Sequence, residues 1–300
     1  MIALGAALKD GITRLGLRLF SRIGRRPLPA ARQRTYWLAR PLQRLMRRRA
    51  RIVARNLELC FPDWNDEQRK QLQREHFNEL ARSVGEIAYT WNQPAPLEPS
   101  IGTVQGLEHL ESARQQQTGI ILVTGHSCNI ELAGRLLCES LPITGVYRPL
   151  DNALLEHYQN QARLRYAQGM IPQSQVRDMV RVLRNGGVLW TAMDQDFGPK
   201  RSVFAPFFNL PTATARGLIE LARLGAARVH PVYPFRAGQN QPLVVEIGPA
   251  FEPFPSADPV ADLSRYNAFL EQAIRRQPAP YWWLHRRFKT APSGTAPRYR

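Results

Sequence analysis

From Ile101 onward, short apolar runs alternate with longer segments in which apolar residues recur every three or four positions. The short runs are rich in β-branched residues and predict buried strands, and the longer segments predict helices that pack on them. The predicted strands are Ile120–Val123, Ile143–Tyr147, Val188–Ala192, Val229–Tyr233 and Leu243–Ile247. The predicted helices are Glu131–Glu139, Asn152–Gln168, Ser174–Leu183 and Ala213–Leu224. This order predicts an α/β fold with a mostly parallel central sheet flanked by helices on both faces.

The first 26 residues have a different pattern. One helical stripe is apolar, and a second stripe is mainly arginine. The apolar stripe consists of Leu8, Ile12, Leu15, Leu19 and Ile23, and the polar one of Asp10, Arg14, Arg18, Arg22 and Arg25. This pattern predicts a basic amphipathic helix that lies in a membrane interface. The alternative is a surface helix packed on the protein's own core. No stretch of the chain supplies the roughly 20 apolar residues that a spanning helix needs.

Between this helix and the α/β part lies a region that predicts further helices. Pro27 ends the first helix, and a second basic segment follows at Thr35–Leu59. Asn65 begins another helix that reaches about Trp91, because it supplies an N-cap before an acidic first turn. We therefore expect a membrane-associating helix at 1–26, a helical region at 27–92, an α/β core at 93–291 and a disordered tail at 292–300.

The charge of the chain is concentrated near its start. The 300 residues carry a net charge of +17, and residues 1–60 hold fifteen basic and two acidic residues, a net +13. Such a segment suits an anionic partner, either nucleic acid or a phospholipid surface. The apolar stripe favours the membrane, and no RNA-recognition or zinc-finger motif is present. Three cysteines give no disulfide framework, which favours a reducing compartment.

The first candidate for chemistry lies where the strand at 120–123 ends. His126 falls at the strand-to-helix turn, where α/β folds place reactive groups. Glu131 follows five positions later, about 140° away on a continuous helix, so contact requires His126 to bend back over the first turn. A carboxylate there would fix the imidazole tautomer and leave the other ring nitrogen to accept a proton from a hydroxyl. The alternative is a pair that only caps the helix.

A second candidate group follows the strand at 143–147. Arg148 comes directly after that strand, and so is expected at the same sheet edge as His126. An arginine there is suited to bind a phosphate or to stabilise a developing oxyanion. The alternative for Arg148 is a salt bridge to Asp151.

A third group follows the strand at 188–192. Asp194 and Asp196 precede a turn, the cations Lys200 and Arg201, and an aromatic run. This order predicts a polar substrate site beside an apolar channel, and the alternative is a turn with solvated charges. We expect no metal site, because no histidine lies nearby in the sequence and a Mg²⁺ site needs more than this pair.

Taken in order, these groups and the proline-bounded strand His230–Pro234 resemble the glycerolipid and lysophospholipid acyltransferase superfamily. More closely, the chain resembles the late acyltransferases of lipid A biosynthesis, the lauroyl/myristoyl type, from about residue 35 to the end. The segments that carry this resemblance are Arg48–Pro62, Gly145–Pro149 with Asp151 and Asn152, Phe197–Pro199, Ser202–Phe204 and Trp283–Thr290.

The resemblance implies transfer of a fatty acyl chain from acyl carrier protein to the 3-hydroxyl of a lipid A hydroxyacyl chain. It also implies residence on the cytoplasmic face of the bacterial inner membrane, with no cofactor besides the acyl carrier protein as co-substrate. His126 matches the catalytic histidine, Glu131 its carboxylate partner, and Arg148 and Asp151 the substrate block. The chain departs from the family in two places. Its N-terminus is more basic than the family's apolar anchor, which predicts peripheral attachment. The residues between His126 and Glu131 also differ, which leaves the preference for acyl-chain length open.

We expect direct transfer, in which His126 deprotonates the acceptor hydroxyl and backbone amides at the helix start, with Arg148, stabilise the oxyanion. Three alternatives stay open. A covalent acyl-enzyme on Cys128 or Ser127 would replace direct attack, a glycerophospholipid or glycolipid would replace the lipid A acceptor, and a basic nucleic-acid- or membrane-binding protein would replace the enzyme.

Overall fold

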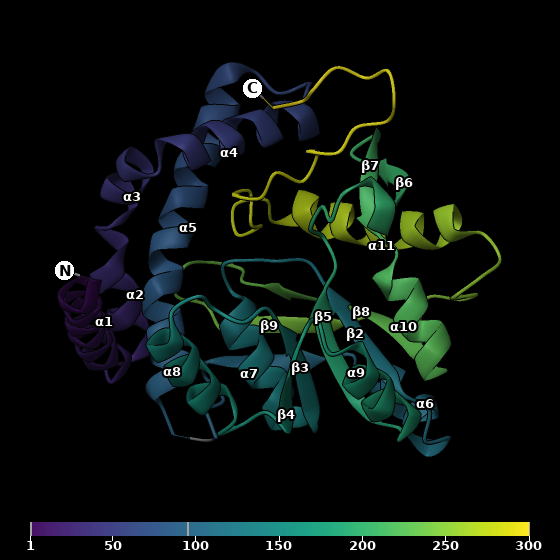
Figure 1. Cartoon of the computed structure of the whole chain (residues 1–300), viewed down its shortest axis with the longest axis horizontal. Coiled ribbons are helices and arrows are strands. Elements are labelled where there is room, and N and C mark those ends of the chain that lie inside the picture. Colours follow the sequence, from purple (N-terminus) through teal and green to yellow (C-terminus); the bar gives the residue numbers. More distant parts are fainter. Residues whose placement is uncertain (1, 95, 300) are drawn as a thin grey trace.

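The computed structural model describes residues 2–94 and 96–299, of which residues 2–9 are described as backbone only. The N-terminal region is helical and consists of α1 (Ile2–Gly24), α2 (Leu28–Tyr36), α3 (Ala39–Leu45), α4 (Arg47–Cys60) and α5 (Asp66–Asn92). Asn65 begins α5 with a capping box, in which its side chain accepts from the Gln68 amide and the Gln68 side chain accepts from the Asn65 amide. Figure 1 shows α5 between the helices α1, α2 and α3 on one side and the central sheet with its helices on the other.

The centre of the molecule is a seven-stranded sheet in the order β1-β9-β8-β2-β5-β3-β4. All neighbouring pairs are parallel except β8 and β9, which confirms the predicted mostly parallel α/β fold. The strands span β1 (Gly102–Gln105), β2 (Ile120–Thr124), β3 (Ile143–Tyr147), β4 (Gly169–Pro172), β5 (Val188–Ala192), β8 (Arg228–Phe235) and β9 (Leu243–Ile247).

The remaining helices connect and cover these strands (Figure 1). They are η1 (Leu107–Leu110), α6 (Glu111–Gln115), α7 (Ile130–Ser140), α8 (Ala153–Arg163), α9 (Val176–Arg184), η2 (Pro199–Arg201), α10 (Gly217–Gly225) and α11 (Pro259–Arg276). A separate antiparallel hairpin of β6 (Ser202–Phe207) and β7 (Leu210–Ala215) packs on α11. The prediction of helix over Ala213–Leu224 was therefore wrong at its start, because residues 213–215 complete β7 and only the later part is helical.

The sheet separates two apolar cores, and β2 contributes to both. Ile121 and Val123 belong to one core with residues of α4, α5 and α11, whereas Ile120 and Leu122 belong to the other with α7. All five β2 residues are buried, as expected of a central parallel strand covered on both sides. Because β2 is the central strand of the sheet, its end and the following His126 lie at the middle of the sheet edge.

The first helix is held to the protein by the packing of its last turns and by a hydrogen bond from Asn152 Nδ2 to Thr13 Oγ1 at 3.2 Å. Phe20 packs against Trp91 and Tyr158, with ring centroids 5.6 and 6.3 Å away, and Gly24 approaches α5 so closely that a Cβ would lie 2.0 Å from the Ala88 carbonyl oxygen. Further toward the N-terminus, three members of the predicted apolar stripe stay exposed: Ile12, Leu15 and Leu19. Leu8, the first member of that stripe, has a side chain that lies outside the described residues. Within the described ranges, no helix has both the length and the apolar composition needed to cross a bilayer.

The C-terminal segment, for which the sequence analysis expected disorder, contacts α4 through Tyr299. Residues 292–299 form no helix or strand, but the Tyr299 hydroxyl donates to Asn56 Oδ1 and accepts from the Phe288 amide. These bonds attach the C-terminal segment to α4, and Figure 1 shows the chain end beside this helix.

Candidate active site

The register of β2 and β5 brings His126 and Asp194 together. The two strands are parallel and pair Thr124 with Ala192, so the residues two positions beyond each strand end lie opposite each other. His126 Nδ1 lies 2.5 Å from Asp194 Oδ1, and the His126 backbone amide donates to Asp194 Oδ2 at 3.0 Å. Gly125 permits this turn, since a Cβ there would lie 2.4 Å from the Leu270 side chain.

Burial and charge set the protonation of this pair. The Asp194 side chain is fully buried, whereas 29% of the His126 side chain is exposed. Burial of the ring lowers the pKa of His126, but the charge and hydrogen bond of Asp194 outweigh that effect and raise the pKa above its ordinary value. Burial alone would raise the pKa of Asp194, but the charge and hydrogen bonds of His126 hold it well below its ordinary value. Asp194 is therefore a permanent carboxylate that binds Nδ1–H and leaves Nε2 as the basic nitrogen.

Two further side chains surround that basic nitrogen. Gln195 Nε2 lies 3.3 Å from His126 Nε2 and 3.1 Å from His285 Nε2, and the two imidazole rings are 5.1 Å apart. Burial, together with the positive charges nearby, lowers the pKa of His285 to about 4, so this ring is neutral near pH 7. The sequence analysis assigned no role to Gln195, and used His285 only as part of a resemblance block. The sequence did hold a signal for Gln195, because this residue directly follows Asp194, just beyond the end of β5.

Glu131 does not lie against His126, contrary to the sequence analysis. Its carboxylate accepts hydrogen bonds from Trp91 Nε1 at 2.8 Å and from Arg163 Nε at 3.2 Å, and it contacts Arg163 Nη2 as well. Among the residues that the structure describes, no hydrogen bond or ion pair joins Glu131 to His126. The reason is the helix geometry: Glu131 lies in the first turn of α7 and points toward α5 and α8, while the ring of His126 points across the sheet edge to β5. Glu131 thus connects three helices behind the site.

The other predicted site residues do not converge on His126. Arg148 and Asp151 are exposed after β3, and no ion pair between them occurs in the described part of the chain. Asp196 accepts from the backbone and hydroxyl of Thr290 at 2.6 and 2.8 Å, which anchors the segment that carries His285. Lys200 and Arg201 are exposed on η2. Of the two acidic residues at i and i+2, only Asp194 contacts His126.

The candidate nucleophiles and oxyanion donors at the start of α7 are already engaged. Cys128 and Ser127 are buried, and burial raises the pKa of the Cys128 thiol well above its ordinary value, so the thiol stays neutral. The amides of Cys128 and Ile130 donate to the carbonyls of Pro280 and Ser127. The Asn129 amide is directed to the Ser127 hydroxyl at 3.3 Å. These three amides are therefore not directed toward Nε2 of His126.

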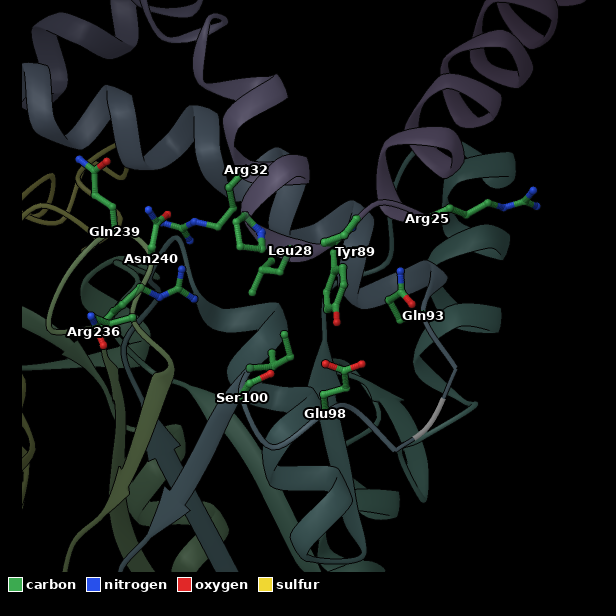
Figure 2. Close-up of a pocket in the computed structure, with 14 residues that line it drawn as sticks. Arg25, Leu28, Arg32, Tyr89, Gln93, Glu98, Ser100, Arg236, Gln239 and Asn240 are labelled. Atoms are coloured by element: carbon green, nitrogen blue, oxygen red, sulfur yellow. The ribbon is translucent and has the colours of Figure 1, made fainter.

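A polar cavity of about 510 Å³ lies apart from His126, between α2, α5 and the loop that follows β8 (Figure 2). Figure 2 shows Arg32 and Arg236 on the same side of this cavity and Arg25 directed away from it. Both buried arginines bind one carboxylate: Glu86 Oε2 lies 2.5 Å from Arg32 Nη1 and 2.7 Å from Arg236 Nη2. Glu86 also accepts from Asn129 Nδ2 at 2.9 Å, which connects this ion cluster to the first turn of α7.

Proteins with known names are similar to nearly the whole chain. The family model described as bacterial lipid A biosynthesis acyltransferase matches residues 6–290. A lipid A biosynthesis lauroyltransferase of Escherichia coli K12 is 35% identical over 291 residues, which cover 96% of this chain and 94% of that relative. A lipid A biosynthesis palmitoleoyltransferase of the same organism is 35% identical over 263 residues, with 87% and 85% covered. A myristoyltransferase from that strain is 25% identical over 257 residues, with 85% and 78% covered. The chain therefore belongs to the bacterial lipid A biosynthesis acyltransferases, and it is an acyltransferase enzyme.

Proposed function

We propose that this enzyme transfers a fatty acyl chain from acyl carrier protein to the 3-hydroxyl of a hydroxyacyl chain on a lipid A precursor. The relatives are named for transfer of lauroyl, palmitoleoyl and myristoyl groups in lipid A biosynthesis, which supports this acceptor and this class of acyl group. One structural observation carries the proposal: a partly exposed imidazole, oriented by a buried carboxylate, offers its Nε2 at the edge of the sheet.

In the proposed reaction His126 acts as general base. The acceptor hydroxyl replaces the Gln195 amide at Nε2 and gives its proton to the ring, while its oxygen attacks the thioester carbonyl carbon. Asp194 stabilises the imidazolium that forms. When the tetrahedral intermediate collapses, the carbon–sulfur bond breaks, the proton on His126 passes to the sulfur, and the products are an ester and the free thiol of the carrier. No acyl-enzyme is needed, in keeping with the buried, neutral thiol of Cys128.

Gln195 takes the role that the sequence analysis gave to Arg148 and the α7 amides. Once displaced from Nε2, its side-chain amide remains within reach of the same atoms and can donate to the carbonyl oxygen as negative charge develops there. A single preorganised donor of this kind contributes about 10²–10³ in kcat. His285, whose Nε2 lies 3.1 Å from the Gln195 side-chain nitrogen, is neutral and restricts the positions that this side-chain amide can adopt.

The enzyme is further proposed to work at the cytoplasmic face of the inner membrane, bound to anionic lipid through α1. The exposed Ile12, Leu15 and Leu19 and the arginines of the neighbouring stripe support this placement. No cofactor and no metal are part of the proposed reaction.

The test is an assay of the purified full chain with acyl carrier protein loaded with a C12–C16 fatty acid and a lipid A precursor, with products identified by mass spectrometry. We expect an ester on a hydroxyacyl chain, and a loss of about 10²–10⁴-fold in activity for H126A. H126A should still fold, with a lower melting temperature, because buried Asp194 loses its main partner. Transfer to a glycerophospholipid but not to the lipid A precursor would overturn the acceptor assignment. Near-normal turnover by H126A would overturn the mechanism.

A further inference from the structure

A second cavity, of about 590 Å³, lies between α4 and the C-terminal segment. It differs from the first in its charge, because five of its lining residues are arginine and one is acidic. The lining consists of Arg48, Arg51, Ile52, Arg55, Glu58, Arg286, Pro297, Arg298 and Tyr299. We refer to it below as the α4 cavity. Its walls come from opposite ends of the chain, which the Tyr299–Asn56 hydrogen bond holds together.

Among the residues that the structure describes, the positive charge of the α4 cavity is only partly balanced. Glu58 pairs with Arg55 at 2.8 Å, whereas Arg48, Arg51 and Arg286 form no ion pair with any residue that the structure describes. Burial, and then the charge of neighbouring Arg55, lowers the pKa of Arg298. In the first cavity, by contrast, Arg32 and Arg236 share the carboxylate of Glu86. Arginines held together without counter-charges repel one another. An anionic ligand would relieve this repulsion, and so would stabilise the α4 cavity more than the first cavity.

The α4 cavity lies directly behind the segment that carries His285. Asn56 on α4 donates to the carbonyl oxygens of Trp283 and His285 at 2.7 and 2.8 Å, and Arg49 donates to that of Leu284 at 3.1 Å. His285 faces Gln195 and the active site, while the next residue, Arg286, lines the cavity. One chain segment therefore forms a wall of both sites.

The residues that line the α4 cavity indicate which kind of anionic partner it binds. A membrane-binding surface pairs its cations with exposed apolar side chains, as α1 does with Ile12, Leu15 and Leu19. In the α4 cavity Ile52 is buried, and no large apolar side chain of the lining is exposed. A concave, arginine-rich surface without exposed apolar groups matches a folded acidic protein and a phosphate, which guanidinium groups bind in a bidentate way.

We infer that the α4 cavity docks the acidic carrier protein that delivers the acyl group, and that it takes the phosphate of the carrier's acyl-bearing arm. This rests on the proposed function, which supplies a carrier-bound donor. Docking there brings the thioester toward His126 past the segment 283–286. The surface of the carrier then pairs with Arg48 and Arg51, which are exposed on the first turns of α4.

The test is the charge-reversed variant R48E/R51E, compared with R177E/R223E, which makes the same charge change at exposed positions on α9 and α10. Fluorescence anisotropy measures binding of labelled acyl carrier protein without any turnover, and a steady-state assay in detergent micelles measures KM and kcat. For R48E/R51E we expect the Kd and the KM for the acylated carrier to rise about 10-fold or more, kcat to stay near wild type, and the salt dependence of kcat/KM to weaken. R177E/R223E should bind like wild type.

A short acyl-pantetheine thioester, which lacks the protein part, serves as a second donor, and R48E/R51E should use it as well as wild type does. Unchanged carrier binding by R48E/R51E would overturn the docking site even if the enzyme is active. Loss of binding to anionic vesicles with unchanged carrier binding would assign the α4 cavity to the membrane instead. Inactivity of the wild type with every carrier-bound donor would overturn the proposed function, and the anisotropy measurement would still decide the docking site.

Discussion

His126 and Asp194 are 68 positions apart in the chain, and their side chains are joined at 2.5 Å because β2 and β5 are parallel neighbours that end at the same level. The aspartate is buried and the histidine is partly exposed. His126 is therefore placed to act as the base, and Asp194 to orient its ring. This arrangement makes the protonation of His126 depend on a single buried charge.

The pH dependence of catalysis follows from that charge. General-base catalysis needs neutral His126, whose pKa Asp194 raises above 6.5, so kcat/KM should rise with pH through an apparent pKa above this value. D194N removes the charge while burial still lowers the pKa, so the rising limb should move to lower pH and the plateau should fall by about 10²–10⁴. His285, with a pKa of about 4, is neutral over this range.

The matched control is D178N, which changes a partly exposed aspartate on α9 that pairs with Arg181. Its pH profile should coincide with that of the wild type. A rising limb that stays in place in D194N would show that a group other than His126 titrates.

Replacement of Gln195 should separate its two proposed roles. Q195A removes a donor from the oxyanion and also frees Nε2 of His126, so kcat should fall about 10²-fold while KM for the acceptor stays level or decreases. Q195E supplies an acceptor instead of a donor and should be at least as impaired. Steady-state kinetics with both substrates varied checks this. Full activity in Q195A would exclude Gln195 from the chemistry.

Glu131 should matter for stability more than for the chemical step. Its ion pair with Arg163 is largely buried, with 12% and 17% of the two side chains exposed. E131A leaves Arg163 and Trp91 without their acceptor, which should cost about 1–3 kcal/mol and lower the melting temperature. The control E220A removes an exposed pair with Arg216, 3.8 Å apart, and should change stability by less than about 1 kcal/mol. If E131A instead loses activity as D194N does, with no change in unfolding, the carboxylate acts on the substrate after all.

The sequence predicted the sheet well because its central strands are buried on both sides. Continuous apolar runs such as Ile120–Val123 identify such strands directly, and three of the five predicted strands have the bounds found in the structure. The edge strands β1 and β4 and the hairpin β6–β7 were missed, since four-residue strands and Pro- or Thr-containing runs give a weak pattern. His126 was found from its place at a strand end. Its partner was not, because pairing with Asp194 depends on the order of strands in the sheet, which local spacing does not contain.

Attachment of the protein to membranes should depend on the exposed part of α1. Ile12, Leu15 and Leu19 are 64%, 59% and 51% exposed, and their helix is held to the fold by Phe20 and Gly24 rather than by these residues. I12S/L15S/L19S should therefore fold normally and lose on the order of 1 kcal/mol of interfacial binding per side chain, about 100-fold in partitioning. V176S/L224S/V260S, three exposed apolar residues elsewhere, is the control. Sedimentation with vesicles containing anionic phospholipid measures the binding of both variants.

The arginine stripe predicts in addition that wild-type binding weakens as salt rises, because screening reduces its attraction to lipid phosphates. Equal binding by the two triple variants would mean that another surface holds the enzyme at the bilayer.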